Sequence, residues 1–595
     1  MNLSKRGVST IVALLLVIML LLEVSSSVQE SQTIDEGIHL SAGYSYLVKN
    51  DFRLNKEHPP LLKTLSAIPL LFIDEDLNSS FNSIYWDNSD QWEFAKDFLY
   101  NNTISADKLL LLGRIPIMLL SLLLGLFVFR WSKELFGPYI GIISLTLFIF
   151  SPNIIAHARY VTTDLGFTAF FFITIYYFYK YLKEPLAKFL LLTGLFFALT
   201  ISSKFSGLFL VPLLPLLYFI SLSKNLHKHN LKNNFKKIIK TFSTILGIGL
   251  MVIIVIYGFE FKKPIEDSLV QNLYQKQENI IKSNSLGDQD DIIQKIISIT
   301  NTNTKSGELI KNFADNTRLP AFSYISGFMK LVGHNYGGHT SYLLGEYSEF
   351  GWWYYFPVAF LAKTPVSILW LLFTGIILVI WQTIKQLREK KSIKYIISKV
   401  QLHWIFLVIP PLLYFLLSLT SNLNLGLRYI LVIYPFIFVI SGLVFRKGIK
   451  NNKIAVKLLT TTLLIFYVTS SLLIYPHYLA YFNEVVGGPD NGPKILTDSN
   501  IDWGQDVKKL KKYLIKDNIE FVCMSYFGQA NLEYYKIDYR YLPDNNKYQG
   551  LEKINCVVAI SVTSLWSQEG EFSWLRELNP DKKIGYSIYI YDLRN

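Results

Sequence analysis

Apolar runs long enough to cross a bilayer recur through most of this chain, and they restrict its fold more than any other feature. A helix needs about 20 apolar residues to cross the hydrocarbon core. Of the 595 residues, 51% are hydrophobic and only 17% are charged, whereas soluble domains carry about 25% charged residues. We therefore predict a polytopic α-helical membrane protein. It should have about 11 spans, near residues 8–24, 109–129, 139–157, 164–182, 189–203, 206–223, 240–258, 362–381, 402–420, 428–445 and 456–475.

Basic residues gather in alternate short loops between these runs, at 224–240, 385–399 and 446–457. Short loops rich in Lys and Arg stay in the cytoplasm, and Lys5-Arg6 places the N-terminus on the same side. We therefore expect a multi-pass protein of the cell membrane with a cytoplasmic N-terminus. The net charge of +13 would suit nucleic acid, but its confinement to these loops argues against such a partner. Three segments should lie outside: 25–108, 259–361 and 476–595.

The first apolar run, residues 8–24, allows a second interpretation as a cleaved signal peptide. The run is short enough, and the small residues Ser25, Ser26 and Ser27 follow it. Cleavage would leave the sidedness of all later loops unchanged. We favour a retained span, because the acidic pair at residues 35–36 needs an anchor at the membrane surface.

The first two outer segments contain stretches that we expect at the membrane surface. Residues 61–71 are apolar but too few to span, which is typical of an amphipathic helix lying in the interface. The second segment is helical in pattern up to Gly337-Gly338 and then becomes aromatic at 351–356. Because Trp and Tyr favour the headgroup layer, this aromatic run should return to the bilayer surface.

The third outer segment reads as a separate small α/β domain. Residues 520–526 and 555–560 are typical of buried strands, and 506–516 of a helix. We therefore divide the chain into a membrane domain, residues 1–475, and an extracytoplasmic α/β domain, residues 476–595. The chain has only two cysteines, Cys523 and Cys556, so no disulfide framework is expected.

An acidic pair, Asp35-Glu36, follows the first span, and His58 and Lys63 come about twenty residues later. Charged side chains at the edge of a bilayer are costly without a partner or a function. Such a carboxylate could act as a base for a substrate that arrives from the membrane. The alternative is structural, with the aspartate capping a helix that begins near Gly37.

Further charges are predicted at the outer ends of the spans. Arg159 and Asp164 lie between the third and fourth spans, and Arg114, Lys204 and Arg428 lie at or near other outer ends. One interpretation is that arginine merely extends toward the headgroups, or that these cations pair with the acids. The other places a lipid phosphate among them, since the planar fork of arginine binds phosphate through two hydrogen bonds.

The second and third outer segments also contain residues that could bind a substrate or a metal. His334, His339 and Glu346 could bind metal, but their spacing matches no standard site. We expect hydrogen bonding or substrate contact instead, assign no metal ligand, and leave a divalent metal open as a cofactor. Trp503 and Gln505 could contact a sugar or peptide, although packing of Trp503 against the membrane domain is an equal alternative.

Taken together, these segments resemble the protein O-mannosyltransferase family of membrane-embedded C-type glycosyltransferases, which also includes the aminoarabinose transferases of lipid A. The order of the motifs carries the resemblance, and parts of the C-terminal region are similar to a prokaryotic phospholipid-carrier-dependent branch. The large central loop lacks an evident β-trefoil domain, a departure that leaves the acceptor open. The matching segments are 34–36, 58–63, 159–164, 204–208, 428–435, 481–484 and 498–506.

The resemblance implies an inverting transferase that moves a sugar from a polyprenyl or dolichyl phosphate to a hydroxyl outside the membrane. The acceptor would be a protein or a glycolipid, and the lipid bilayer itself would be a partner. The core chemistry would lie in the spans and the first outer loop, so residues 490–595 need not touch the sugar. From the residues and the resemblance together, the predicted site residues are Asp35, Glu36 and Asp164 for catalysis; Arg159, Arg428, Lys63, Lys204 and Arg114 for the donor phosphate; and His58, His339, Glu346, Trp503 and Gln505 for substrate binding.

Two other classes of protein compete with this hypothesis. A transporter or lipid flippase would show inverted repeats and broken helices with charges at mid-membrane, whereas the charges here are predicted at outer ends. A scaffold or receptor that presents the C-terminal domain would not need acids and cations on one face. We therefore favour the glycosyltransferase.

Overall fold

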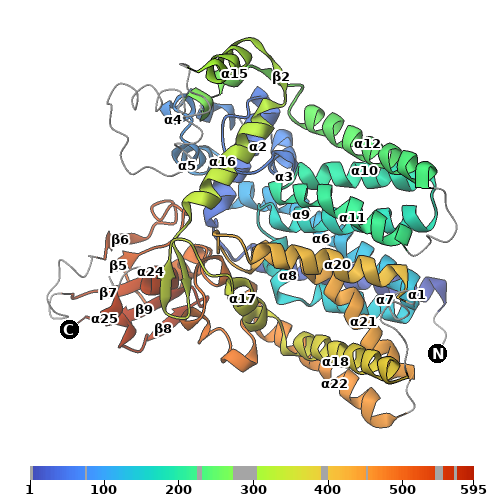
Figure 1. Ribbon diagram of the computed structural model, residues 1–595. Coiled ribbons are helices and arrows are strands. Elements are labelled where there is room, and N and C mark those ends of the chain that lie inside the picture. Colours follow the sequence, from blue (N-terminus) through green and yellow to red (C-terminus); the bar gives the residue numbers. More distant parts are fainter. Residues whose placement is uncertain are drawn as a thin grey trace.

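The computed structural model describes residues 4–73, 77–223, 231–267, 269–271, 304–389, 400–450, 453–542, 554–567 and 572–594. Long helices run side by side in a bundle, and a sheet domain lies at one end of it (Figure 1). The predicted fold class, a polytopic helical protein with a C-terminal α/β domain, is confirmed.

A helix covers each predicted span. Pro138 begins one helix directly after Gly137, whose φ of 98° suits glycine, and Ser151 caps the next. The axes of these two helices differ by 63° across a short break. The helices are α1 (Lys5–Ser27), α6 (Ala106–Phe136), α7 (Pro138–Ile149), α8 (Pro152–Ala158), α9 (Asp164–Lys183), α10 (Ala187–Ile201), α11 (Leu210–Ser223), α12 (Leu231–Ile256), α18 (Val366–Arg388), α20 (Leu402–Ser418), α21 (Tyr434–Lys450) and α22 (Ile454–Leu473).

Not every one of these helices has the length and hydropathy of a membrane span. Within the described parts of the chain, seven helices are long and apolar enough to cross a membrane, or eight if the bent pair counts as one span. Two others, α10 and α20, are apolar but shorter. The figure of about 11 spans therefore stays a prediction.

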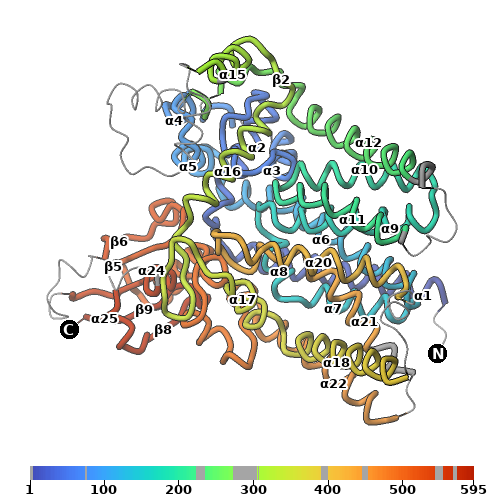
Figure 2. The backbone as a smooth tube through the Cα atoms, viewed as in Figure 1, coloured from blue at the N-terminus to red at the C-terminus, as the bar shows by residue number. Residues whose placement is uncertain are grey.

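The helix ends fall into two groups at opposite ends of the bundle. The N-terminus and the adjoining ends of α11, α12, α18 and α22 lie at one end, and the sheet domain lies at the other (Figure 2). Much of the three predicted basic loops, at 224–230, 390–399 and 451–452, lies outside the described residues. The cytoplasmic side of these loops therefore stays a prediction.

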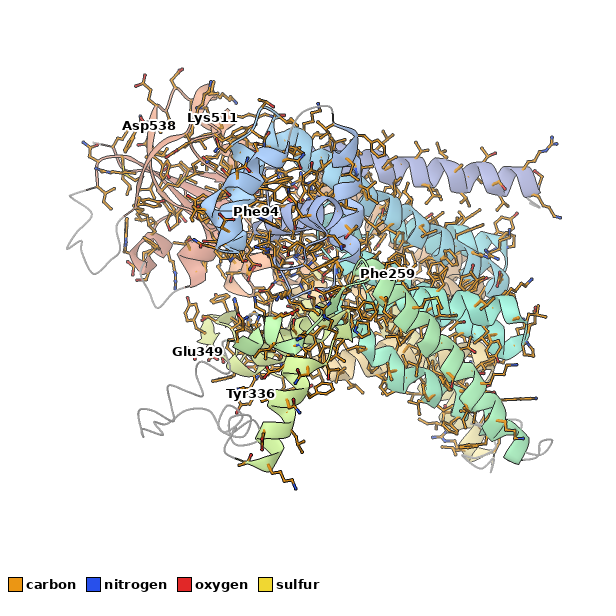
Figure 3. All side chains as sticks on the ribbon, turned by 90° about the horizontal axis from the view of Figure 1, so that it is seen from above. Phe94, Phe259, Tyr336, Glu349, Lys511 and Asp538 are labelled. Carbon is orange, nitrogen blue, oxygen red and sulfur yellow. A yellow bond between two sulfur atoms is a disulfide. The ribbon has the colours of Figure 1, made fainter. Side chains whose placement is uncertain are left out.

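Short helices of the first outer segment cover the end of the bundle that faces the sheet domain. Phe81, Trp86, Phe94 and Phe98 form an aromatic cluster there, in which Phe94 contacts the other three rings. Figure 3 labels Phe94 among these helices. The elements are α2 (Ile34–Lys49), α3 (Leu61–Ala67), η1 (Ile68–Phe72), η2 (Leu77–Asn82), α4 (Ile84–Asp87) and α5 (Gln91–Tyr100).

The predicted interfacial stretch 61–71 is helical, but α3 packs against α2 and α6. A Cβ atom on Gly43 of α2 would lie 2.0 Å from the carbonyl oxygen of Lys63, so only glycine permits this approach. Leu62 is buried, whereas Leu71 of η1 is 47% exposed. Only the last part of the stretch therefore presents apolar surface.

The second outer segment lies between the helices and the sheet domain. Its helix α16 runs from the outer edge of the molecule toward the sheet domain (Figure 1), and the aromatic run 351–356 leads into α17. Its elements are β1 (Phe261–Lys262), η5 (Pro264–Glu266), α15 (Lys305–Asn316), β2 (Leu319–Pro320), α16 (Phe322–Gly337), β3 (Ser341–Leu343), β4 (Glu346–Ser348) and α17 (Tyr355–Lys363).

The C-terminal segment forms a five-stranded mixed sheet in the order β6-β5-β7-β9-β8. Strand β5 pairs in parallel with β6 and β7, and β9 pairs antiparallel with β7 and β8. Val507, Leu510 and Leu514 of α23 join the core of this sheet. The predicted helix and both strands are confirmed. The elements are α23 (Val507–Lys516), β5 (Phe521–Ser525), β6 (Asp538–Tyr541), β7 (Val557–Ser561), α24 (Val562–Ser567), α25 (Ser573–Arg576), β8 (Lys582–Ile584) and β9 (Ile588–Asp592).

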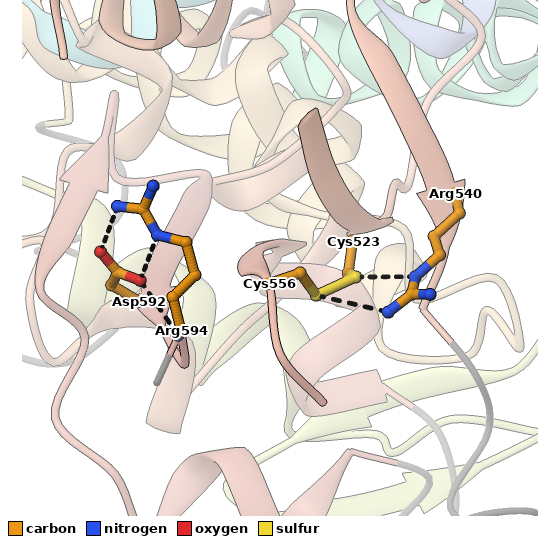
Figure 4. Close-up of a disulfide and its surroundings, with 5 residues drawn as sticks. All are labelled: Cys523, Arg540, Cys556, Asp592 and Arg594. Carbon is orange, nitrogen blue, oxygen red and sulfur yellow. Dashed lines mark hydrogen bonds and ion pairs between the residues drawn. A yellow bond between two sulfur atoms is a disulfide. The ribbon is translucent and has the colours of Figure 1, made fainter. Parts of the chain in front are cut away.

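Cys523 and Cys556 form a disulfide, which the sequence analysis did not anticipate. The pairing of β5 with β7 brings them together, and Arg540 Nε lies 3.1 Å from Cys523 Sγ; the surface ion pair of Arg594 with Asp592 lies nearby (Figure 4). Disulfides persist in oxidising compartments outside the cytoplasm. The bond therefore agrees with the predicted outside location of this domain.

Residues just after the predicted domain boundary pack against the helical part. Lys363 of α17 is buried, and its amine donates to the carbonyl oxygens of Leu479, Tyr481 and Asn500. Asn483 donates to the carbonyl of Thr364 at 2.9 Å. The boundary at 475/476 stays a prediction, but the segment up to about residue 506 is fastened to the membrane domain.

Candidate active site

A cavity of about 500 Å³ opens where the first outer segment, the 423–429 turn, the second outer segment and the C-terminal segment meet. Its lining includes Asp35 of α2 and Arg428 of η6 (Leu427–Ile433), which leads into α21. Among the predicted substrate contacts, His58, His339 and Trp503 also line it. The fold thus gathers residues from four separate parts of the sequence.

Asp35 and Arg428 form an ion pair in this cavity. Arg428 Nη1 lies 2.7 Å from Asp35 Oδ2. Its Nε donates to the carbonyl of Leu425 at 3.2 Å, and its guanidinium lies 4.3 Å from the centre of the Trp503 ring. Both charged side chains remain partly exposed, at 20% for Asp35 and 11% for Arg428. A substrate can therefore reach both groups.

Asp164 and Lys204 form a second pair behind Arg428. Lys204 Nζ lies 2.6 Å from Asp164 Oδ1, and Arg428 Nη1 lies 3.8 Å from Asp164 Oδ2. Lys204 also lies 4.3 Å from the centre of the Tyr429 ring. Both members of the pair are buried and neither lines the cavity. Their contacts orient Arg428 and Tyr429.

Glu36 points away from the cavity and is fully buried. Arg114 binds both its carboxylate oxygens, at 2.7 and 2.6 Å. The backbone N–H groups of Val161 and Thr33 also donate to it, each at 3.0 Å. Glu36 is therefore a structural centre that ties the start of α2 to α6 and to the segment after α8.

Asp35 does not cap helix α2, contrary to the structural alternative. Helix α2 begins at Ile34, after the N-cap residue Thr33, whose N–H is bound by Glu36. Asp35 lies in the first turn, past the cap, so the proposed capping of a helix near Gly37 is wrong. Asp35 lines the cavity instead.

Besides Lys204, three predicted phosphate-binding cations lie outside the cavity lining. Arg159 pairs with Glu30 at 2.7 Å and is fully buried. Arg114 holds Glu36, as described above. Lys63 Nζ donates to Tyr46 Oη and to the carbonyls of Asn55 and His58, at 2.9, 2.6 and 2.7 Å. Arg428 alone of the five predicted cations lines the cavity in the described part of the chain.

Two predicted substrate contacts also lie elsewhere. Glu346 is exposed on β4, opposite Leu343 of β3. Gln505 is buried and fixes its own loop, accepting from the N–H of Trp503 at 2.7 Å and donating to the carbonyl of Ile501 at 3.0 Å. Trp503 itself packs against Arg428 and the edge of Tyr160, so its packing role is observed and its contact with substrate stays a prediction.

Residues that sequence reasoning did not select complete the lining. They include His39, Trp92, Tyr355, Asn424, Tyr429 and Asp498. The resemblance at 498–506, which begins with Asp498, could have pointed to that residue. Nothing in the local sequence singles out His39 or Trp92. Residues 490–595, which the resemblance did not require near the sugar, thus contribute directly to the cavity wall.

Burial controls the protonation of two cavity histidines. The pKa of His58 is lowered well below its ordinary value, first by burial and then by the charge of Lys204. The pKa of His39 is also lowered by burial, against the attraction of Asp35. Both imidazoles are therefore neutral near pH 7. Among the described residues, no three His, Cys, Asp or Glu side chains form a group that could hold a metal ion.

We expect Glu36→Gln to destabilise the protein by about 3–5 kcal/mol, the usual cost of removing one partner of a buried ion pair. The reason is that Arg114 would keep a buried charge without its anion. Thermal unfolding of the purified protein measures the effect. Glu93→Gln, which breaks the exposed pair with Lys96, is the matched control and should change little. Equal stability of the two variants would contradict the structural role of Glu36.

Residues 106–257 match the family model described as dolichyl-phosphate-mannose-protein mannosyltransferase. The matched segment begins with α6 and contains Arg114, Arg159, Asp164 and Lys204. A comparison with curated proteins gives no match. No comparison supports the transporter alternative.

Several solved structures are similar at low sequence identity. The Saccharomyces cerevisiae protein O-mannosyltransferase Pmt1-Pmt2 complex, bound to the sugar donor, is 20% identical at a TM-score of 0.34, covering 44% of this chain and 34% of that one. This chain thus spans about a third of the yeast protein. ArnT from Cupriavidus metallidurans, bound to undecaprenyl phosphate, is 11% identical at 0.42, covering 98% and 99%. The Archaeoglobus fulgidus oligosaccharyltransferase is 13% identical at 0.45, covering 97% and 73%.

The family match spans the part of the chain that holds Asp164 and Lys204, the two residues that contact Arg428 and Tyr429 behind the cavity. Over residues 106–257 the chain is therefore similar to the dolichyl-phosphate-mannose-protein mannosyltransferases, and its predicted resemblance to this family of membrane glycosyltransferases is confirmed.

Proposed function

We propose that this protein transfers a sugar from a polyprenyl or dolichyl phosphate to a hydroxyl group on the outer face of the membrane, with inversion at the anomeric carbon. The observation that carries the proposal is that a carboxylate, Asp35, and a phosphate-binding type of cation, Arg428, share one cavity. The cavity is lined by the outer segments and the C-terminal segment, where we propose that the lipid-linked donor binds. The family match over residues 106–257 supports the same donor class.

Asp35 is proposed as the general base. Its carboxylate would accept the proton of the acceptor hydroxyl while that oxygen attacks the anomeric carbon. The bond between this carbon and the phosphate oxygen would break in the same step, and the lipid phosphate would leave with the bonding electron pair. A single displacement needs one base and forms no bond between sugar and protein. His39 and His58 are neutral, so neither balances the negative charge of Asp35. Arg428 balances it through the ion pair.

Arg428 is proposed to exchange partners during the reaction. Its guanidinium pairs with Asp35 at 2.7 Å, so the proposed base is engaged by this cation. A donor phosphate would compete for the same guanidinium and form charge-assisted hydrogen bonds with it. The exchange would release Asp35 for the acceptor proton and stabilise the charge that grows on the leaving phosphate. Binding of the donor would thus prepare the base.

The acceptor class stays open between a protein Ser or Thr and a lipid or glycan hydroxyl. The test is incubation of membranes containing this protein with radiolabelled dolichyl-phosphate mannose, undecaprenyl-phosphate mannose and other polyprenyl-phosphate sugars. We expect one donor to lose its label to protein, lipid or glycan in membranes with the protein and in none without it. Absence of transfer from every donor, with folded protein present, would contradict the proposal.

A further inference from the structure

Asp498 is a cavity residue that the proposed chemistry does not use. It begins the short helix η10 (Asp498–Asn500) of the C-terminal segment, and its side chain is only half-buried because it faces the cavity. Its backbone has a φ of 56°, in the left-handed region that aspartate and asparagine tolerate better than most residues. Such backbone conformations cluster at functional sites when the surroundings enforce them.

Hydrogen bonds fasten the turn of Asp498 to the segment that carries Arg428. The N–H of Asp498 donates to Thr563 Oγ1 at 3.1 Å. Ser499 Oγ donates to the carbonyl of Leu425 at 2.7 Å, and the N–H of Leu427 donates to Asn500 Oδ1 at 3.0 Å. The position of Asp498 relative to Arg428 is therefore fixed by direct contacts with Leu425 and Leu427, which come just before the arginine.

The carboxylate of Asp498 differs from the other cavity carboxylates in its partners. Asp35 pairs with Arg428, and Glu57 pairs with Lys330 at 2.7 Å. Asp498 has no cation within ion-pair distance among the described residues; its Oδ1 accepts from the N–H of Ser499, and no donor in the described chain contacts Oδ2. Burial raises its pKa, while the charge of Arg428 opposes the rise. Because Asp498 lines the cavity, a ligand there can supply the hydrogen-bond donor that Oδ2 lacks.

We propose that Asp498 is a substrate-binding residue whose Oδ2 accepts a hydrogen bond from a hydroxyl group of the reactants. The inference rests on the proposed function, because that function brings hydroxyl-rich molecules into this cavity. The hydroxyl belongs either to the sugar of the donor or to the acceptor. Both sources present the same donor chemistry to a carboxylate, and the experiment separates them.

The experiment compares purified full-length wild type with Asp498→Asn and Asp498→Gly. Asparagine keeps the oxygen that accepts from Ser499 and tolerates the left-handed backbone, while glycine keeps only the backbone. Asp490→Asn is the matched control, since Asp490 lies in the same segment, is 62% exposed and pairs only with Lys583 in the described chain. Thermal unfolding checks that each variant is folded.

Three quantities are measured: the Kd of the labelled polyprenyl-phosphate sugar that serves as donor for the wild type, its KM, and the KM of the molecule that the wild type labels. We expect at least a tenfold rise for Asp498→Gly and a smaller rise for Asp498→Asn, with Asp490→Asn unchanged. A rise in the Kd and KM of the donor assigns the hydroxyl to the sugar. A rise confined to the KM of the labelled molecule assigns it to the acceptor.

Unchanged Kd and KM values in both folded Asp498 variants, with an active wild type, would overturn the inference and leave the proposed function standing. A fall in kcat alone would also overturn it, because a binding contact of this kind must appear in Kd or KM. A wild type that transfers no sugar from any donor would instead refute the proposed function, and the inference with it.

Discussion

Asp35→Asn should lower the rate of sugar transfer by ~10²–10⁴-fold, the usual contribution of a general base, and leave the fold intact. Asparagine has nearly the same shape but cannot accept the acceptor's proton. The fold should tolerate it because Asp35 does not cap α2, and its ion pair is partly exposed in the cavity. The rate of label transfer at saturating donor measures the effect, together with thermal unfolding and the Kd of the donor.

The control for this variant is Asp51→Asn in the same outer segment. Asp51 pairs with the exposed Arg53 and lies outside the cavity lining, so its loss should leave transfer and stability nearly unchanged. Near-normal transfer by Asp35→Asn would remove Asp35 from the role of base. A loss of transfer accompanied by unfolding would show instead that Asp35 has a structural role like that of Glu36.

Arg428→Ala should weaken donor binding by about 10- to 100-fold. Hydrogen bonds to charged groups contribute about 1.5–3 kcal/mol, and each 1.4 kcal/mol is tenfold in affinity. The variant should also slow the transfer step, because the leaving phosphate would lose its stabilising charge. Equilibrium binding of labelled donor and single-turnover transfer separate the two effects.

Arg428→Lys provides the informative comparison, since lysine keeps the charge but not the planar fork that binds phosphate through two hydrogen bonds. Compared with Arg428→Ala, we expect Arg428→Lys to recover part of the donor affinity and a smaller part of the transfer rate. Arg130→Ala serves as the control, because Arg130 is 51% exposed, pairs with Glu134 and takes no part in the cavity lining. Wild-type donor affinity and rate in Arg428→Ala would show that this arginine only anchors the turn beside Trp503.

The contribution of the C-terminal segment to the cavity changes how the protein can be dissected. Trp503 contacts Arg428, and its carbonyl accepts the N–H of Ile34 at 3.1 Å, directly beside Asp35. Ser31 donates in the same way to the carbonyl of Gln505 at 2.9 Å. Removing residues 476–595 would therefore open the site that holds Asp35. Point variants such as those at Asp498 test this segment more cleanly than truncation.

Hydrophobic pattern and charge alone predicted much of this molecule. The runs of apolar residues located the helices, because a helix in a bilayer must satisfy its own backbone hydrogen bonds and cover them with apolar side chains. Short strand patterns located β5 and β7 in the same way. The acids and cations at the predicted outer ends identified Asp35 and Arg428, since a charge in that position needs a partner or a function.

Tertiary structure decided which of these charges could meet a substrate. Asp35 and Glu36 are neighbours in sequence, but successive residues of a helix point in different directions, so one faces the cavity and the other is enclosed by Arg114. The sequence also could not show which of Arg428 and Arg159 lines the cavity. Each pairs with an anion from a distant segment, Arg428 with Asp35 and Arg159 with Glu30. Ion pairing and burial depend on contacts between segments hundreds of residues apart, and only the folded chain specifies them.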